Sequence, residues 1–520
     1  MATRVTSNSI EDTLLMTENY LLLTRAGIDT HQEPVVYMRK DCHVCRAEGF
    51  NAQGRVQVCV GKRSIIATLN VVSGNLFSHQ QAALSESAWK LLRAREGDKA
   101  FFKHAPPVES MSHVRGKLYG KAFTLASARE IITDIRDDRY SDIQLSAFIT
   151  ACVANAMNLE ETIAITQAMV ESGQRFHWGD NIRVMDKHCV GGLPGNRTTP
   201  IVVAIVAAQG LLMPKTSSRA ITSPAGTADT METLTNVALS MQAMHDVVRD
   251  QGACLAWGGS VSLSPTDDII IRVERALDLD SEGQLVASVI SKKVAAGATH
   301  VLIDIPVGPT AKVRSQEVAT KLGELLQRTG EAMGLQIRII QSDGTQPVGR
   351  GIGPTLEARD VLSVLQNHAD APEDLRNRAL AVAAVLLEMG EVCAAREGLE
   401  LARQTLVSGQ AWEKFRNICM AQGGLKTPPV AAHTHTLSST HTGIVTLFDN
   451  RSLSRLASLA GAPGAPAAGL DLHVRLGDRV AKGQALMTIH AEAPGELEYA
   501  LDYQAAHPDI IRIDTDPGGL

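Results

Sequence analysis

The sequence predicts an α/β fold in which a helical domain accompanies an α/β domain, with a β-rich barrel-like module at the N-terminus and an α+β domain at the C-terminus. Three observations lead to this prediction. Short strand-like segments fill the first hundred residues, capped helical patterns follow, and strand, glycine-rich loop and helix then alternate from about residue 180. These changes of pattern divide the chain into 1–104, 105–178, 179–370, a helical segment at 371–429, and 430–520.

The first two parts are predicted from local patterns. Strands are expected at 20–24, 35–39, 55–60 and 64–71, and the first helical periodicity appears over 80–94. Three helices are expected within 124–173, because Ser127, Ser141 and Asn158 each stand three residues ahead of a Glu or Gln that can complete a capping box.

The central part alternates strands and helices, which predicts a parallel sheet with right-handed crossovers. Strands are expected at 182–185, 211–214, 254–257, 300–305 and 336–340, with helices within 198–208 and 231–239. Further helices are expected at 371–389 and 393–405, and terminal strands at 443–448, 473–476 and 485–490, with a hinge at 461–469. In such sheets the chemistry sits in the loops that follow the strands.

Composition excludes several classes of protein. The 520 residues include 50 Lys and Arg against 56 Asp and Glu, a net charge of −6 that argues against an open nucleic-acid groove. The longest apolar run, 199–214, is interrupted by Gln209 and Gly210 and is too short for a membrane span. We expect a cytoplasmic protein, since the N-terminus lacks a secretory pattern and eight cysteines are too sparse for a disulfide scaffold.

One cysteine pair and one group of histidines are interpreted as residues without a metal or redox role. Cys42 and Cys45 form a C-x-x-C without a second ligand pair, so we favour plain thiols over a zinc or redox site. His433, His435 and His441 lie in a Thr/Ser-rich stretch that we expect to be an exposed linker, and we predict no metal site.

Two loops carry the candidate chemistry. The first, 186–199, contains Gly191, Gly192 and Gly195, which let the backbone approach a ligand, and it opens onto a helix N-terminus beside Lys187 and Thr198. It is a candidate phosphate cradle without the P-loop spacing. The second, 215–229, is rich in hydroxyl side chains and also opens onto a helix. Loops after successive strands converge at one sheet edge, so together they indicate one site.

The combination of these loops resembles the thymidine/pyrimidine-nucleoside phosphorylase family. The resemblance rests on Asp186-Lys187-His188-x-x-Gly191-Gly192, Ser217-x-Arg219, Gly226-Thr227 and Ser288-x-x-Ser291-Lys292-Lys293, and it spans about residues 105 to 500. The N-terminal module and the sequence of 218–227 resemble the long branch, which contains AMP phosphorylases and bacterial thymidine phosphorylase-like proteins.

The resemblance implies a role for each matching residue. His188 or Asp280 would donate the proton to the leaving base. The residues implied to bind phosphate are Lys187, Cys189, Thr198, Ser217 and Thr227. Those implied to bind the rest of the substrate are Gly192, Ser218, Arg219, Ala220, Ile221, Thr222, Ser223, Ser288, Lys292 and Lys312. Ser288 and Lys292 are spaced i, i+4 on an expected helix and therefore share one face.

The chain departs from the family pattern at two places. Cys189 replaces a serine after Asp-Lys-His, and a thiol is the weaker hydrogen-bond partner for phosphate. The family's Tyr-x-x-Arg ahead of the Ser/Lys helix has no clear equivalent in 275–280, which leaves the identity of the base open.

The expected reaction is therefore phosphorolysis of an N-glycosidic bond, in which thymidine and phosphate give thymine and 2-deoxyribose 1-phosphate. Phosphate is a co-substrate, no cofactor is expected, and the family implies a homodimer or larger assembly. AMP phosphorolysis to a free base and ribose 1,5-bisphosphate is the main alternative. A phosphoribosyltransferase and a non-enzymatic assembly protein are more distant ones.

Overall fold

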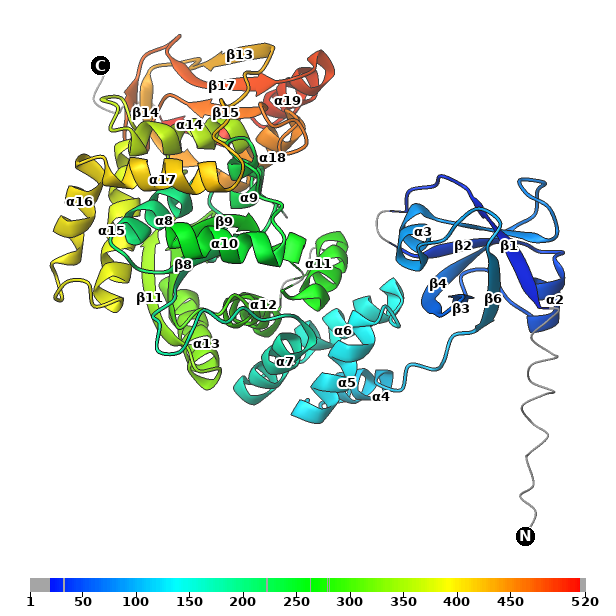
Figure 1. Ribbon diagram of the computed structural model, residues 1–520. Helices are drawn as coiled ribbons and strands as arrows, with labels where there is room; N and C mark the ends of the chain where they lie inside the picture. The colour runs from blue at the N-terminus through cyan, green and yellow to red at the C-terminus, as the bar shows by residue number, and fades with distance from the viewer. Residues whose placement is uncertain are drawn as a thin grey trace. The chain divides into compact units, whose positions relative to one another are not determined.

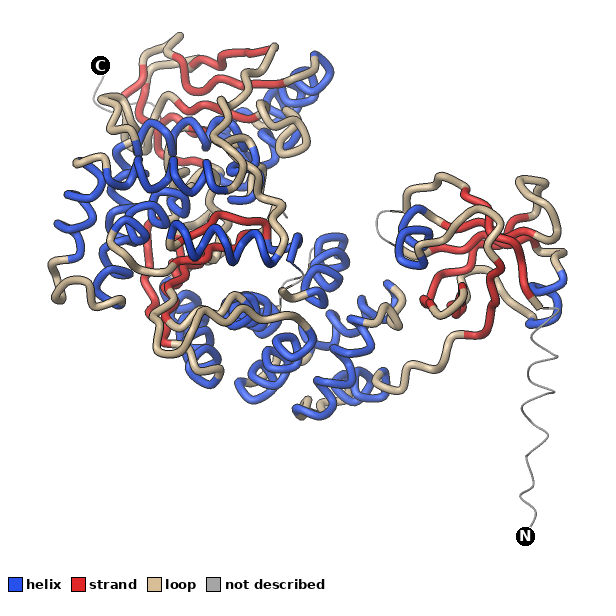
Figure 2. The backbone as a smooth tube through the Cα atoms, viewed as in Figure 1, coloured by secondary structure: helices blue, strands red, loops and turns tan. Residues whose placement is uncertain are grey.

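The computed structural model describes residues 19–30, 33–220, 223–261, 263–277, 279 and 281–514, which form two compact units (Figures 1 and 2). The first unit comprises the described residues up to Lys121 together with Glu130–Ala154. The second comprises Ala122–Arg129 and the described residues from Asn155 onward. Each unit has its own hydrophobic core.

The first unit contains a closed six-stranded barrel with strand order β1-β5-β2-β4-β3-β6. Its strands are β1 (Tyr20–Arg25), β2 (Val35–Arg39), β3 (Arg55–Val60), β4 (Arg63–Val72), β5 (Gln81–Leu84) and β6 (Lys99–His104). The four predicted strands are confirmed, whereas the helix predicted over 80–94 is wrong in its first half. Strand β5 occupies that half, and α3 (Glu86–Leu92) begins only after Ser85, whose hydroxyl accepts the Ala88 N–H at 3.3 Å.

A short helix, α2 (His43–Glu48), explains the C-x-x-C motif. Cys42 is its N-cap, and its sulfur accepts the backbone N–H of Cys45 at 3.2 Å. Both cysteines are buried and free, and burial raises the pKa of both thiols. The motif therefore caps a helix inside the barrel core.

The three helices predicted within 124–173 are confirmed as α5 (Leu125–Arg136), α6 (Asp142–Ala154) and α7 (Leu159–Ser172). Asn158 and Glu161 complete the predicted capping box at the start of α7. A further helix, α4 (Met111–Leu118), packs on α6 within the first unit.

The second unit is built on parallel strands in the order β11-β10-β7 and β8-β9, and a parallel bridge between Val184 and Leu212 joins the two groups. The strands are β7 (Met185–Cys189), β8 (Met213–Ser217), β9 (Ala253–Trp257), β10 (His300–Val307) and β11 (Gln336–Asp343). Helices α8 (Thr198–Ala208) and α15 (Glu373–Met389) pack with Met185 and Leu302 on one face. Helices α12 (Glu282–Ala295) and α13 (Gln316–Ala332) pack with Val301 and Ile303 on the other.

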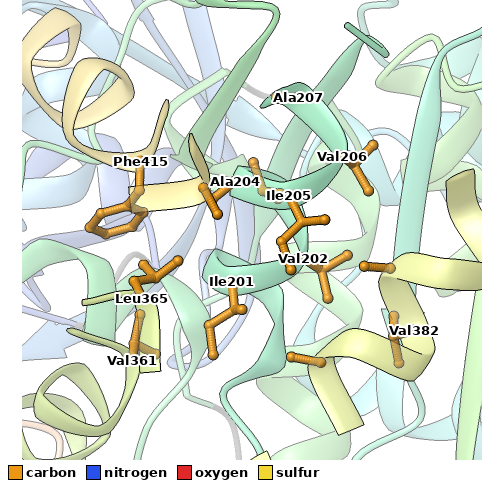
Figure 3. Packing of buried hydrophobic residues seen from close by; sticks show 14 of the residues in the cluster. Ile201, Val202, Ala204, Ile205, Val206, Ala207, Val361, Leu365, Val382 and Phe415 are labelled. Carbon is orange, nitrogen blue, oxygen red and sulfur yellow. The ribbon is translucent and has the colours of Figure 1, made fainter. Parts of the chain in front are cut away.

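Helix α8 is the centre of this core and is apolar all round. Figure 3 shows Ile201 and Ile205 of α8 among Val382 of α15, Val361 of α14 (Pro354–Leu365) and Phe415 of α17 (Gln410–Ala421). A helix covered on every side cannot shift easily, so the loop that precedes it is firmly anchored at its end.

Two predicted strands are displaced toward the C-terminus. Strand β7 starts at Met185 rather than at 182, and β8 starts at Met213 rather than at 211. Residues 186–189 and 215–217, expected in loops, therefore lie within strands. The charged and polar side chains of these residues are untypical of buried strands. The sequence pattern alone could not predict strands there, because the partners that compensate the buried charges are distant in sequence. The helix expected over 231–239 is also wrong: α9 (Thr227–Glu232) ends earlier, and α10 (Met241–Gln251) begins at the Ser240 cap.

The remaining helices and strands complete the second unit. Its further helices are α11 (Pro265–Leu277), α16 (Gly398–Val407), α18 (Asn450–Leu459) and α19 (Pro494–Ala506), together with the short 3-10 turns η1 (Gly258–Val261) and η2 (Pro508–Ile510). One terminal sheet contains β12 (Gly351–Ile352), β15 (Gly469–Leu472), β17 (Ala485–Ala491) and β13 (His433–Ser438) in this order. The other contains β16 (Arg479–Val480), β14 (Gly443–Phe448) and β18 (Ile511–Asp514).

Two expectations for the C-terminal part are corrected. The strand expected at 473–476 is instead β15, which lies just before it and pairs with β17. His433 and His435 lie on strand β13 rather than in a linker, because cross-strand pairing with β17 outweighs their polar sequence. Among the described residues, no helix is long and apolar enough to cross a membrane.

Candidate active site

Strand β7 carries four polar residues in a row, and the alternation of a strand sends them to opposite faces of the sheet. Lys187 points to the α8 face, where its ammonium donates to the Thr198 hydroxyl at 2.7 Å. Asp186 points to the α12 face, where it meets Lys293. Strand β7 therefore contacts helix α8 on one face of the sheet and helix α12 on the other. His188 and Cys189 lie at its carboxyl end.

Three lysines are buried around this strand. Lys187, Lys215 of β8 and Lys293 of α12 are each no more than 5% exposed. Asp186 lies 3.2 Å from Lys215 Nζ and 3.0 Å from Lys293 Nζ, and it also accepts the Lys187 N–H at 2.6 Å. Although burial opposes it, the two lysines keep the pKa of Asp186 below its ordinary value.

The lysines outnumber the nearby carboxylates. Burial lowers the pKa of Lys187, and Asp304 on β10 counteracts this. Burial likewise lowers the pKa of Lys293, against the attraction of Asp186. Three lysines thus lie near two carboxylates in a region of low dielectric. Buried charge without a partner is costly, so the arrangement favours the entry of an anion.

The surroundings of His188 favour the neutral form of its imidazole. Burial and then the lysines at 293, 215, 292 and 187 lower the pKa of its imidazole well below 6.5. The ring is therefore neutral at pH 7. It can donate one N–H hydrogen bond to a group that gains negative charge.

The glycine loop after β7 fits tightly against its neighbours. Gly192 has a φ of +77°, and a Cβ there would lie 2.5 Å from the backbone nitrogen of Lys312. Gly195, at a φ of +67°, would clash in the same way with the Val348 carbonyl at 2.3 Å. Only glycine readily adopts a positive φ and also has no Cβ to clash with the neighbouring backbone. The two predicted site residues Gly192 and Lys312 are therefore brought into contact.

Cys189 ends β7 and remains a neutral thiol. Burial raises its pKa to about 11, and the side-chain amide of Asn196 donates to its sulfur at 3.4 Å. The thiol therefore brings no negative charge to the candidate phosphate cradle. A thiol is also only a weak hydrogen-bond donor to phosphate.

The second loop is closed by acidic residues whose structural role sequence reasoning missed. Asp229 accepts the backbone N–H groups of Ala220 at 2.6 Å and Gly226 at 2.8 Å. Arg219 donates to Glu232 at 2.8 Å and lies over the Trp257 ring at 4.8 Å. Its guanidinium is thus already paired within the protein.

Arg197 joins the two loops. It donates to Glu357 at 2.7 Å, to the Thr227 hydroxyl at 2.7 Å and to the Ala225 carbonyl at 2.9 Å. Burial raises the pKa of Glu357 to about 7, while Arg197 acts to lower it. The loops that the sequence expected to converge are therefore linked by hydrogen bonds from Arg197, which also pairs with Glu357 of α14.

Helix α12 presents the two candidate base contacts, Ser288 and Lys292, on the helix predicted for them. Lys292 pairs with Asp267 of α11. Burial opposes its charge, but Asp267 raises the pKa of Lys292 above its ordinary value, so it is an ammonium group.

Most of the predicted site residues lie on β7, β8, the loops that follow these strands, and helix α12. Ser217 ends β8, the Ser218 carbonyl accepts the Ala228 N–H at 3.4 Å, and the Ser223 hydroxyl donates to the Ala225 carbonyl at 3.0 Å. Ile221, Thr222 and Asp280 lie outside the described residues. Sequence reasoning missed the roles of Asp186, Lys215, Lys293, Arg197, Asp229 and Glu357, although Asp186 and Lys293 stand inside the motifs that carried the resemblance. Within the described ranges, no cluster of His, Cys, Asp and Glu suited to a metal is found.

Comparison with known families covers the chain in three parts. Residues 112–173 match the helical bundle domain of a glycosyl transferase family, and residues 181–412 match the α/β domain of the same family. Residues 444–508 match the pyrimidine nucleoside phosphorylase C-terminal domain. Fold and site therefore define a pentosyltransferase, an enzyme that transfers a sugar unit from or to a base, and the predicted fold class is confirmed.

Full-length relatives give the family. Two proteins named "Putative thymidine phosphorylase" are 60% and 58% identical, one from Hahella chejuensis and one from a Polaromonas species; each match covers 96% of this chain and 98% of the relative. The chain belongs to the thymidine/pyrimidine-nucleoside phosphorylase family, in its long branch. Anthranilate phosphoribosyltransferase from Thermus thermophilus shares the fold at 17% identity, with a TM-score of 0.50 over 59% of this chain and 98% of that one.

The first prediction concerns the phosphate cradle. Replacing Lys187 with alanine removes a buried ammonium, and charge-assisted hydrogen bonds typically contribute ~1.5–3 kcal/mol. We expect phosphate KM to rise or kcat/KM for phosphate to fall by about 10- to 100-fold. Steady-state kinetics with varied phosphate measure this, with the surface variant Lys321→Ala as control. Unchanged kinetics in Lys187→Ala would remove this lysine from the site.

The second prediction concerns His188. Its lowered pKa means that below pH 6.5 the unfolded chain binds a proton at this histidine that the folded chain does not, so its contribution makes stability fall as pH drops through 6.5. We expect its NMR signal, assigned by its loss in His188→Gln, to stay neutral at about pH 6 in the folded protein. In urea the same histidine should titrate near 6.5. Titration at about 6.5 or above in the folded state contradicts the electrostatic account.

Proposed function

We propose that this enzyme cleaves thymidine with inorganic phosphate and releases thymine and 2-deoxyribose 1-phosphate. The observation that carries the proposal is the group of three buried lysines: Lys187 on β7, Lys215 on β8, and Lys293 on α12, the helix that also bears Ser288 and Lys292. An anion site next to a helix with a hydroxyl and an ammonium on one face suits a phosphate beside a pyrimidine.

The proposed reaction is a displacement at the anomeric carbon. A phosphate oxygen forms a bond to C1′ while the bond from C1′ to the base nitrogen breaks, and its electron pair stays on the base. Lys187, Thr198, Ser217 and Thr227 fix the phosphate, so that positioning supplies much of the acceleration. The Lys292 ammonium and the Ser288 hydroxyl hold the base and offset its developing charge.

The departing base must receive a proton. A neutral His188 can donate an N–H hydrogen bond to the base as negative charge builds there, which supports a role on the α12 face. Asp280 is the other candidate that the family resemblance implies. Phosphate supplies the nucleophile and the bond changes are balanced without electron transfer, so we propose no cofactor.

AMP is the second candidate substrate, because the long branch contains AMP phosphorylases. A 5′-phosphate adds about two negative charges that need cationic partners when buried. Arg219, the candidate in the hydroxyl-rich loop, is already bound by Glu232 and Asp229. This pairing supports a nucleoside over a nucleotide, since an incoming 5′-phosphate would have to displace two carboxylates.

We also propose that the enzyme is a homodimer or larger. Large apolar side chains are exposed on two helices that pack on each other in the first unit: Tyr119 at the end of α4 is 87% exposed and Ile143 of α6 is 83% exposed. Such residues are typical of a surface that a second copy covers. A cytoplasmic location stays a prediction from the sequence.

The third prediction tests the substrate. With phosphate present, thymidine should give thymine and 2-deoxyribose 1-phosphate, whereas AMP should give little product, as followed by chromatography of the released base. If AMP were the substrate, Lys312→Ala should damage its turnover far more than that of a bare nucleoside. With thymidine as substrate the same variant should be nearly silent.

Two outcomes would redirect the proposal. Robust AMP cleavage without thymidine cleavage would make the enzyme a nucleotide phosphorylase. Strict dependence on magnesium with a diphosphorylated ribose would favour a phosphoribosyltransferase, whose chemistry relies on that ion.

The fourth prediction tests assembly. Light scattering at micromolar concentration should give at least twice the monomer mass of 55.6 kDa. Replacing Ile143 with glutamate places a charge on the exposed apolar surface and should shift the protein toward the monomer. The control Leu476→Glu makes the same kind of change at a partly exposed leucine elsewhere. A wild-type monomer would contradict the proposal.

A further inference from the structure

One buried ion-pair cluster connects the two halves of the candidate site. Asp186 lies on β7 beside Lys187, Lys293 lies on α12 beside Lys292, and the charged groups of Asp186 and Lys293 are 3.0 Å apart. Lys215 of β8 reaches the other oxygen of the same carboxylate at 3.2 Å. The side chains of Asp186, Lys215 and Lys293 are all almost fully buried.

We propose that Asp186 and Lys293 are positioning residues, whose ion pair, braced by Lys215, holds helix α12 against strand β7 so that base and phosphate stay aligned for attack. The inference deepens the proposed function, on which it rests. Neither residue is proposed to touch substrate. Their effect passes through Lys187 and His188 on the strand and through Ser288 and Lys292 on the helix.

The location of the pair supports this role. Each partner is the immediate neighbour of a residue proposed to bind substrate, so a shift of the pair moves phosphate and base contacts relative to each other. Displacement chemistry is sensitive to such shifts, because a misplacement of about 1 Å can cost about 100-fold in rate. A hydrophobic contact between α12 and β7 would tolerate sliding, whereas an ion pair that joins a carboxylate to two ammonium groups fixes direction as well as distance.

Stability alone gives a weaker reason for the cluster. Desolvation of buried charges offsets much of their attraction, so well-packed neutral residues often replace a buried ion pair without loss of stability. Removing one partner is a different matter, because it leaves the other charge buried and unpaired. A test must therefore replace both partners together.

The experiment compares two double variants that carry the same net charge as the native cluster. Asp186→Asn with Lys293→Met leaves Lys215 as the remaining ammonium, and the connection to α12 is lost. The matched control, Asp186→Asn with Lys215→Met, leaves Lys293, whose ammonium can still donate to the new amide oxygen at position 186. The two proteins differ only in which lysine remains.

We expect the double variant Asp186→Asn with Lys293→Met to have a melting temperature and a phosphate Kd close to those of the control. The phosphate Kd is measured by calorimetry without nucleoside. The kcat of this double variant should fall at least about 10-fold below that of the control, with a higher thymidine KM. Equal kcat and KM in the two variants would overturn the proposal and leave the cluster a structural element.

A conservative variant covers the case in which the double variants do not fold. Lys293→Arg keeps the charge but changes the length and geometry of the side chain, so kcat should fall about 10-fold at unchanged phosphate Kd. Wild-type kcat in this variant would also overturn the proposal. If no variant folds, the pair is required for folding, and the positioning role is rejected.

The wild-type enzyme in the same assay separates this inference from the proposed function. Absence of thymidine turnover in the wild type refutes the substrate. In that case the variants are compared on whichever nucleoside or nucleotide the wild type cleaves. Wild-type turnover with equally active double variants refutes the positioning role alone.

Discussion

The burial of three lysine side chains, one on β7, one on the neighbouring parallel strand β8 and one on helix α12, is the constraint around which the second unit is organised. Charges in such a place need partners, and Asp186 provides one for both Lys215 and Lys293. Lys187 instead donates to Thr198 at the first turn of α8. The partners come from different elements, so satisfying the charges also fixes β7, β8, α8 and α12 together around the proposed phosphate site.

The two loops of the candidate site are likewise fixed by contacts with distant parts of the chain. Gly192 and Gly195 bring the first loop so close to Lys312 and Val348 that no side chain fits between them. Arg197 then links this loop to the second one through Glu357 and Thr227. The result is a cradle whose positive groups are prearranged before a ligand arrives, which lowers the reorganisation that binding and catalysis require.

Local patterns in the sequence sufficed for the elements whose side chains alternate cleanly and for the helices with capping residues. Strand β3, in which buried Val56 and Val58 alternate with Arg55 and Gln57, and the capping box at Asn158 are examples. The ends of β7 and β8 could not be predicted, because Asp186 and Lys215 look like loop residues until their partners are known. Those partners lie on other elements, and Lys293 is on a helix far along the chain from Asp186. The motifs located the candidate site, whereas the pairing within it required the fold.

The central claim is that Lys187, one of the buried lysines, binds the phosphate that attacks the nucleoside. A crystal structure of the enzyme with phosphate and a non-cleavable pyrimidine nucleoside analogue tests it most directly. The account predicts phosphate within hydrogen-bond distance of Lys187 Nζ, at the carboxyl ends of β7 and β8, with the base against Ser288 and Lys292. Phosphate bound elsewhere in an otherwise fully occupied complex would contradict it.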